Sequence, residues 1–150
     1  MIALFAAAAL QFPDWKHPRW GAGPAEVAAA LALPADGGEA REDIRGMQAK
    51  VRGPLVYGPH AVMAKLFFKD DRLTVITLKL ARPEACEGLD LQLASTYGRP
   101  LLYRHYDGGV FVDAWDARNG DRITLSGGPG RAGYCDMTIG PPRRDRFNTY

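Results

Sequence analysis

The chain lacks a strong charge imbalance and any long apolar run. Its 150 residues carry 19 basic and 17 acidic side chains, which leaves a net charge of +2. A dedicated nucleic-acid-binding protein has a basic face, so nucleic acid is not an expected partner. The apolar run at residues 1–10 is about half as long as the ~20 residues of a membrane-spanning helix, and no later run is longer. We therefore expect no transmembrane span.

Motifs for nucleophilic, phosphate-dependent or metal chemistry are also missing. No serine lies in a G-x-S-x-G elbow, and the glycine-rich segment 126–131 lacks the Lys-Ser/Thr that ends a P-loop. His17, His60 and His105 lie in separate segments and lack the spacing of a metal site. We therefore expect no metal, no cofactor and no enzymatic activity.

Cysteine is scarce, and its two positions leave two interpretations open. Cys86 and Cys135 lack a C-x-x-C spacing and a neighbouring histidine cluster, which argues against zinc. They are either two separate buried thiols or one disulfide between the second expected helix and the last strand. Export from the cytoplasm favours the disulfide.

The composition of the two ends suggests how the domain is bounded. Residues 1–10 have the apolar core and small residues of a secretory signal but no basic start. They are either a signal-peptide remnant or an apolar N-terminal segment that packs on the domain. We expect one domain over residues 11–140, a polar tail at 141–150, and a periplasmic or secreted location.

Helix signals followed by β-hairpin signals occur twice along the chain. Pro24 begins a first helix and Pro34 ends it, and a second helix spans 83–97, with an apolar stripe. The expected strands span 48–57, 61–69, 73–80, 101–106, 110–117, 121–126 and 133–139. This helix-then-hairpins layout predicts an α+β fold, in which two helices pack on one face of an antiparallel sheet of six or seven strands.

Turn residues support this order of strands. Asp70-Asp71 predicts a tight turn, and Asn119-Gly120 predicts a type I′ hairpin, which requires positive φ at both residues. Gly53-Pro54 lies inside an expected strand. Because proline cannot donate to a strand ladder, it predicts an edge strand or a bulge there.

Three stretches resemble a group of small exported bacterial proteins of unknown function. They are Trp20-Gly21 with Glu26-Val27, residues 66–73, and the Leu-x-x-x-Tyr-Gly-x-Pro of residues 93–100. The resemblance extends more loosely to the two-layer folds of the BamE (SmpA/OmlA) lipoproteins and the β-lactamase inhibitor protein. It implies helices followed by an antiparallel sheet, function through protein–protein contact, and no catalytic residues. A lipobox cysteine, which the BamE pattern has near its start, is missing here.

The candidate binding residues are Phe67, Tyr103, His105, Asp113 and Trp115. We expect the three aromatic residues to be exposed on the face of the sheet that the helices leave uncovered, and Asp113 to be an outward strand residue. The leading hypothesis is a non-enzymatic envelope module that binds another protein through this face. The alternative is a small-ligand-binding domain or a hydrolase with a cleft near His105, Asp113 and Trp115, in which Asp107 or Asp113 orients His105 as a base.

Overall fold

A computed structural model describes residues 13–35, 43–129 and 133–142. The expectations for residues 1–10, and for the tail beyond residue 142, lie outside the described residues. Within the described ranges, no helix combines the length and the apolar character needed to cross a bilayer.

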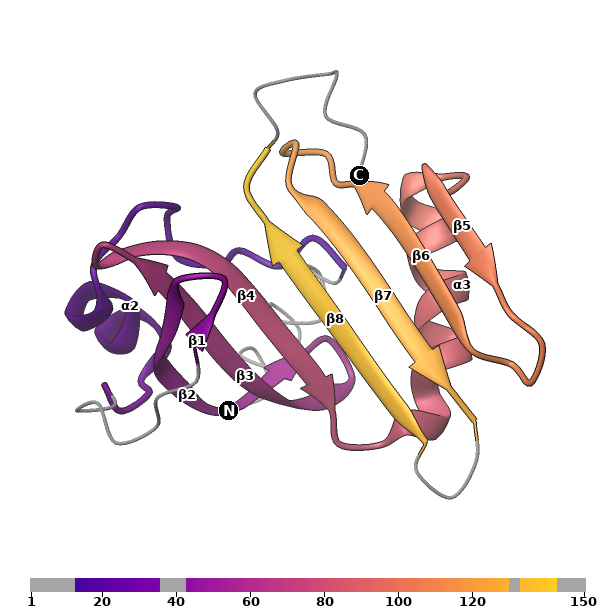
Figure 1. The fold of residues 1–150 in the computed structure, drawn as a ribbon, viewed down its shortest axis with the longest axis horizontal. Coiled ribbons are helices and arrows are strands. Elements are labelled where there is room, and N and C mark those ends of the chain that lie inside the picture. Colours follow the sequence, from indigo (N-terminus) through magenta and orange to yellow (C-terminus); the bar gives the residue numbers. More distant parts are fainter. Residues whose placement is uncertain (1–12, 36–42, 130–132, 143–150) are drawn as a thin grey trace, which may run out of the picture.

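The described residues form one antiparallel sheet with the strand order β1-β2-β3-β4-β8-β7-β6-β5 (Figure 1). The strands are β1 (Asp43–Ile44), β2 (Met47–Tyr57), β3 (His60–Lys69), β4 (Arg72–Leu80), β5 (Leu102–His105), β6 (Phe111–Asp116), β7 (Arg122–Gly128) and β8 (Tyr134–Gly140). Strands β4 and β8 pair in the middle and join the two halves of the sheet. The predicted α+β class is confirmed, with seven strands of four residues or more beside the two-residue β1.

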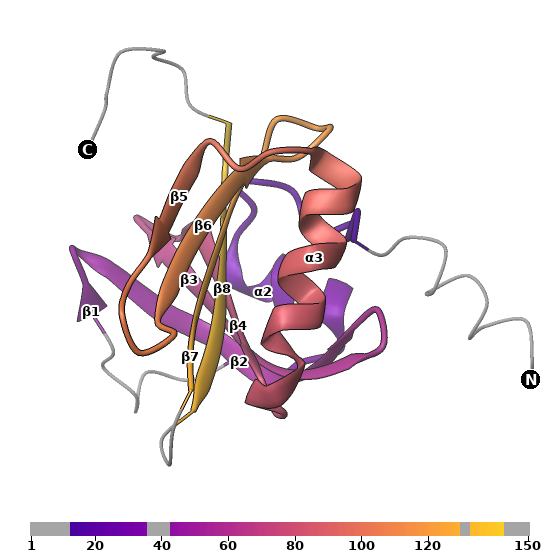
Figure 2. The same cartoon turned by 90° about the vertical axis from the view of Figure 1, so that its right-hand side faces the viewer.

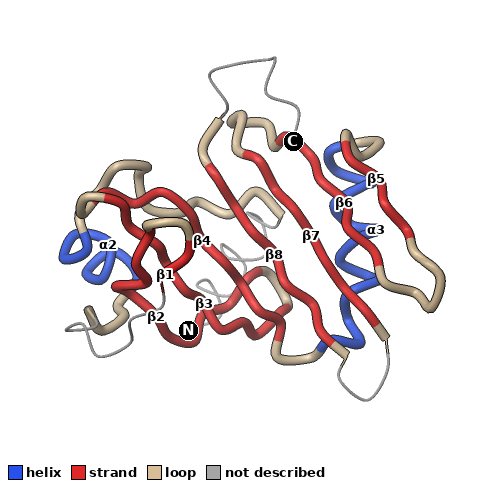
Figure 3. Tube along the Cα trace, in the orientation of Figure 1, coloured by secondary structure: helices blue, strands red, loops and turns tan. Residues whose placement is uncertain are grey.

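Both described α-helices lie against the same face of this sheet (Figure 2). Helix α2 (Pro24–Leu31) precedes β1, and the 3₁₀ turn η1 (Pro83–Ala85) leads into helix α3 (Cys86–Tyr97) between β4 and β5. In a view of the sheet, α3 lies behind β6 and β5 (Figure 3). The apolar stripe predicted for the second helix is confirmed, because Cys86, Leu89 and Leu93 are buried.

Strand register divides the side chains between two faces, since directly paired antiparallel residues point to the same side. One row of pairs beneath the helices defines what we call the core face: Gly53, Ala64, Leu78, Met137, Leu125, Asp113 and Tyr103. The next row defines the open face, which no described helix covers: Arg52, Lys65, Thr77, Thr138, Thr124, Ala114 and Leu102. The core is therefore apolar and lies between helices and sheet, whereas the open face is mostly polar.

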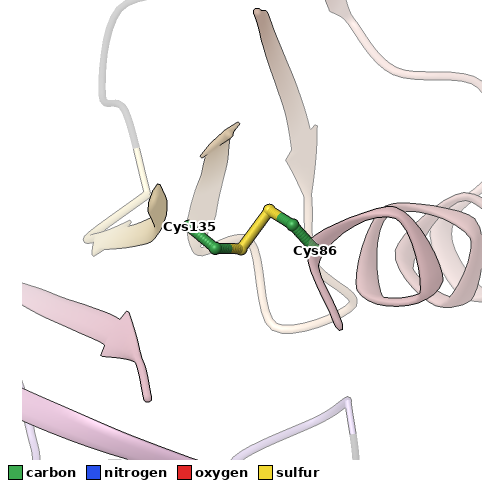
Figure 4. The surroundings of a disulfide bond; sticks show 2 residues. All are labelled: Cys86 and Cys135. Carbon is green, nitrogen blue, oxygen red and sulfur yellow. A yellow bond between two sulfur atoms is a disulfide. The ribbon is translucent and has the colours of Figure 1, made fainter. Parts of the chain in front are cut away.

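A disulfide between Cys86 and Cys135 links the start of α3 to β8 (Figure 4). Their Cα atoms are 5.6 Å apart and the two residues are separated by 49 positions. Closing a loop of this length stabilises a fold by about 4 kcal/mol in the chain-entropy model. Gly127 is required beside it, because a Cβ there would lie 2.6 Å from Sγ of Cys86. Strand β7 continues to Gly128, whereas we expected a loop to begin at residue 126.

The hairpin turns lie where we predicted them, but one of them is of a different turn type. Asp70 and Asp71 have φ of 50° and 57°, as a two-residue type I′ turn requires. The Asn119-Gly120 turn is different. Of these two residues only Gly120 has positive φ, and Ala117 N–H donates to the carbonyl of Asp121 at 2.8 Å. The type I′ prediction at this position is therefore wrong.

Candidate functional site

The aromatic residues that we expected to be exposed on the open face are distributed differently. Trp115 lies on the core face and is 1% exposed, and its Nε1 donates to the carbonyl oxygen of Gly98. Tyr103 is 66% exposed, but it pairs with Asp113 and therefore lies on the core-face side, at the edge of the sheet. Asp113 is 1% exposed rather than outward. In β6, Val112 and Ala114 alternate with Asp113 and Trp115. Both faces of the strand are therefore apolar enough to be buried.

Phe67 does lie on the open face, where it pairs with Ala49 and Val75, but it is only 1% exposed. It lines a hollow of about 350 Å³. The other residues around this hollow are Ile44, Met63, Lys65, Thr77, Leu78, Lys79, Asp136 and Thr138. We call it the open-face hollow. The hollow has an aromatic wall, two lysines and one carboxylate. It therefore suits an apolar group that is flanked by polar groups.

Three of the candidate residues meet at the other end of the sheet. Nε2 of His105 is 3.1 Å from both carboxylate oxygens of Asp113. The ring of Tyr103 stacks on the ring of His105, with centroids 3.9 Å apart and planes 14° apart. Asp90 of α3 joins them as a neighbour of Asp113, which is one of the causes that raise the pKa of Asp90. We call these four residues the edge cluster, and it brings α3, β5 and β6 together.

The edge cluster contains two neighbouring carboxyl groups, and the pKa of one of them is raised. The pKa of Asp90 is raised to about 7, chiefly by burial, then by the neighbouring carboxyl group of Asp113 and by the negative charge of Glu87. The positive charge of His105 opposes this rise. Two neighbouring carboxylates do not both ionise readily, so the carboxyl group of Asp90 keeps its proton up to about neutral pH.

Asp90 was missed in the sequence, although a signal for it exists. It lies four residues after Cys86 and three before Leu93, on the flank of the apolar stripe of α3. A carboxylate at that spacing is directed toward the sheet. The strand residue that it meets follows only from the register of β6.

The edge cluster has the parts of an oriented base. Among the described residues, Nε2 of His105 makes the hydrogen bonds and Nδ1 makes none, while the side chain is 40% exposed. Asp113 fixes the ring in the way that a carboxylate orients a catalytic histidine. None of four cavities elsewhere in the described residues is lined by His105, Asp113 or Trp115.

A second histidine–aspartate pair lies under the extended segment 13–20, which we call the strap. Nε2 of His17 is 2.5 Å from Oδ2 of Asp121, and Nδ1 contacts the carbonyl oxygen of Pro18 at 2.6 Å. Trp20 Nε1 donates to Oδ1 of Asp121 at 2.9 Å, and Asn119 Nδ2 donates to Oδ2 at 2.8 Å. Sequence reasoning assigned Asp121 to a turn and His17 to a loop, because 104 positions separate them.

The strap also closes a small cavity of about 230 Å³ against the sheet. Tyr97 donates from its hydroxyl to Oδ1 of Asp14 at 2.6 Å, and Arg118 lies 3.4 Å from Oδ2 of the same carboxylate. Burial and the hydrogen bond to Asp14 raise the pKa of the Tyr97 hydroxyl. These contacts join the strap to α3 and to the turn after β6, so they hold the strap in place.

Metal chemistry finds no support in the described ranges, where no three histidine, cysteine or carboxylate residues are grouped to hold an ion. Comparison of the chain with protein-family models, with curated proteins and with solved structures finds no match. The resemblance to exported two-layer proteins therefore stays a prediction.

Proposed function

We propose that this protein is a non-enzymatic protein-binding module of the cell envelope, which docks its partner on the open face of the sheet. The observation that carries the proposal is the placement of α2 and α3 on the same face. We interpret the helix-then-hairpins layout as the origin of this asymmetry, since each helix covers the strands that follow it from the same side. The eight-stranded sheet thereby has one face that no helix of the described residues covers.

Exposed apolar side chains support this surface. Val56, Met63 and Ile44 are all well exposed at the β1–β3 end of the sheet, and two of them line the open-face hollow. Exposed apolar side chains that gather around a concave surface are typical of interaction sites. The hollow takes one apolar side chain of the partner, and Lys79 at its rim favours a neighbouring carboxylate.

The proposed location rests on the disulfide. Such bonds persist in oxidising compartments and are rare in the cytosol. The bond between Cys86 and Cys135 therefore supports a periplasmic or secreted protein. The resemblance to exported proteins that act by protein–protein contact agrees with this location.

A matched pair of charge substitutions tests the docking face. Met63→Glu places a carboxylate at the rim of the open-face hollow, and Leu91→Glu places one on the exposed side of α3. Both baits and the unchanged protein are incubated at micromolar concentration with envelope extract, and bound proteins are quantified by mass spectrometry. We expect a partner that is lost with Met63→Glu and kept with Leu91→Glu. No partner at this concentration contradicts the function, and equal loss with both variants contradicts the assigned face.

The geometry of His105 favours one second candidate, a hydrolase or small-ligand site at the edge cluster. The supporting observation is the paired 3.1 Å contact of Nε2 with Asp113, which leaves Nδ1 available as a base. Turnover of p-nitrophenyl acetate by the unchanged protein and by His105→Gln tests it. A rate that falls to the buffer background in the variant supports this candidate, and equal rates reject it.

A further inference from the structure

The two edges of the sheet are protected to different degrees. On the β2 side, β1 pairs with Met47 and Gln48, and Ala35 forms a bridge to Val51. Further along β2, Pro54 lacks an N–H and cannot pair with an added strand. Strand β5 ends the sheet on the other side, where the described part of the chain supplies no added strand, bridge or proline of this kind. Natural proteins usually guard such edges because an unpaired strand invites another chain.

The outward backbone groups of β5 are available for pairing. Tyr106 N–H donates to the carbonyl of Val110 at 2.8 Å, which directs the backbone of Tyr106 toward β6. Alternate residues of a strand point their backbone groups to the same side. Arg104 is therefore turned toward β6 as well, and Tyr103 and His105 turn their N–H and carbonyl groups away from the sheet.

Three of the exposed side chains along this edge are apolar, and one of them is held in place by its neighbours. Leu101, Tyr103 and Tyr106 are 67%, 66% and 53% exposed. Tyr103 is stacked on His105, whose ring is held by the buried Asp113. An aromatic surface that is already ordered loses little side-chain entropy when a partner binds.

The charge of Arg104 decides which kind of strand fits. In an antiparallel pair of two copies centred on Arg104, which lets both outward residues bond across the axis, Tyr103 would pair with His105 and Arg104 would lie directly opposite Arg104 of the second copy. Like charges at directly opposed positions are destabilising. A strand of another protein with a carboxylate at that position gains an opposite-charge pair instead.

We propose that the β5 edge binds an extended segment of another protein by β-strand addition, and that this segment carries a carboxylate opposite Arg104 between two apolar residues. The flanking apolar residues then lie on the Tyr103 and His105 side of the added strand. This contact goes beyond the docking on the open face and does not depend on it, because it uses backbone groups at the opposite end of the sheet from the open-face hollow.

Two synthetic peptides test the proposal on the full chain: acetyl-Thr-Val-Glu-Val-Thr-amide and the same peptide with lysine in place of glutamate. Binding is followed by the backbone amide shifts of Tyr103 and His105 in NMR titrations. We expect the glutamate peptide to bind at least tenfold more tightly than the lysine peptide. Arg104→Glu is expected to reverse this preference, and the matched change Lys79→Glu on the open face is expected to leave it unchanged.

Three outcomes overturn the proposal. They are no amide shift at millimolar peptide, an equal response to both peptides, and a preference that Lys79→Glu reverses as strongly as Arg104→Glu. Tyr103→Pro removes one outward N–H at an edge where proline is tolerated, and it is expected to abolish peptide binding while the fold, followed by circular dichroism, is kept. Sedimentation that shows a dimer lost in Tyr103→Pro would assign the edge to a second copy. Met63→Glu separates this test from the open-face proposal, since it is expected to leave peptide binding intact.

Discussion

The molecule contains two histidine–aspartate pairs that look alike as residue types but differ in their surroundings. His17 and Asp121 are both nearly inaccessible, with side chains 9% and 6% exposed. In the edge cluster the side chain of Asp113 is just as buried, at 2%, but that of His105 is 40% exposed. The first pair joins the strap to a turn, and the second joins an edge strand to its neighbour.

The difference lies in how many hydrogen-bonding positions each pair has filled. Asp121 accepts from His17, Trp20 and Asn119, and both ring nitrogens of His17 have acceptors. His105 uses one nitrogen, and Asp113 lies beside Asp90, whose pKa is raised to about 7. A filled pair holds structure, whereas a pair with an unused nitrogen and a proton that titrates near neutral pH is able to respond to its surroundings.

The largest effect is expected when Asp121 is replaced by asparagine. Asparagine has one acceptor oxygen where the carboxylate has two, so its amide group would face either the His17 or the Trp20 donor. A buried donor left without an acceptor, together with loss of the charge opposite His17, costs about 3 kcal/mol. Urea unfolding of Asp121→Asn at pH 7 measures this loss. A change under 1 kcal/mol would contradict a structural role of the filled pair.

A smaller effect on the free energy of unfolding, which depends on pH, is expected from the carboxyl group of Asp90. Its carboxyl has an unfolded-state pKa near 4 and a folded-state pKa of about 7. Between these two pKa values the folded protein binds more protons than the unfolded chain. The stabilisation that the protonated Asp90 carboxyl contributes at low pH is therefore lost as the pH rises from about 4 to 7. Above pH 7 the contribution no longer changes.

The measurement compares two variants. Urea midpoints between pH 4 and pH 8 are expected to fall more steeply with pH in the unchanged protein than in Asp90→Asn, which has no group to titrate there. Carbon-13 shifts of the Asp90 carboxyl give its pKa directly. A midpoint near 4 in the folded protein would contradict the raised pKa of Asp90.

Local signals predicted the elements of the fold well. Pro24 at a helix start, Asp70-Asp71 at a turn and Pro54 near a sheet edge each act within a few residues of sequence. Their consequences do not require knowledge of the rest of the chain. The α+β class and the position of almost every hairpin follow from such signals.

The faces of β6 could not be predicted in the same way. Val112 and Ala114 are as suitable for burial as Trp115, so alternation does not identify the core side. Register with β7, together with the position of α3, decides it. His17 and Asp121 meet for a similar reason, because the strap crosses the sheet at a point that only the tertiary structure defines. The expected exposure of Trp115 and Asp113 was thus wrong, because both are buried.

The smallest effect is expected from the change Asp113→Asn, the same substitution that is costly at Asp121. At this position the remaining oxygen of the asparagine still accepts from His105, so one of the two contacts of Nε2 is kept, and the new amide group is a donor beside Asp90. Removal of the negative charge also lowers the pKa of Asp90, since the charge of Asp113 is one of its causes. We expect stability at pH 7 to change by about 0.5 kcal/mol or less, with a weaker pH dependence between 4 and 7. A loss as large as that of Asp121→Asn would show that both pairs are structural, and the edge cluster would then lose its distinction from the strap.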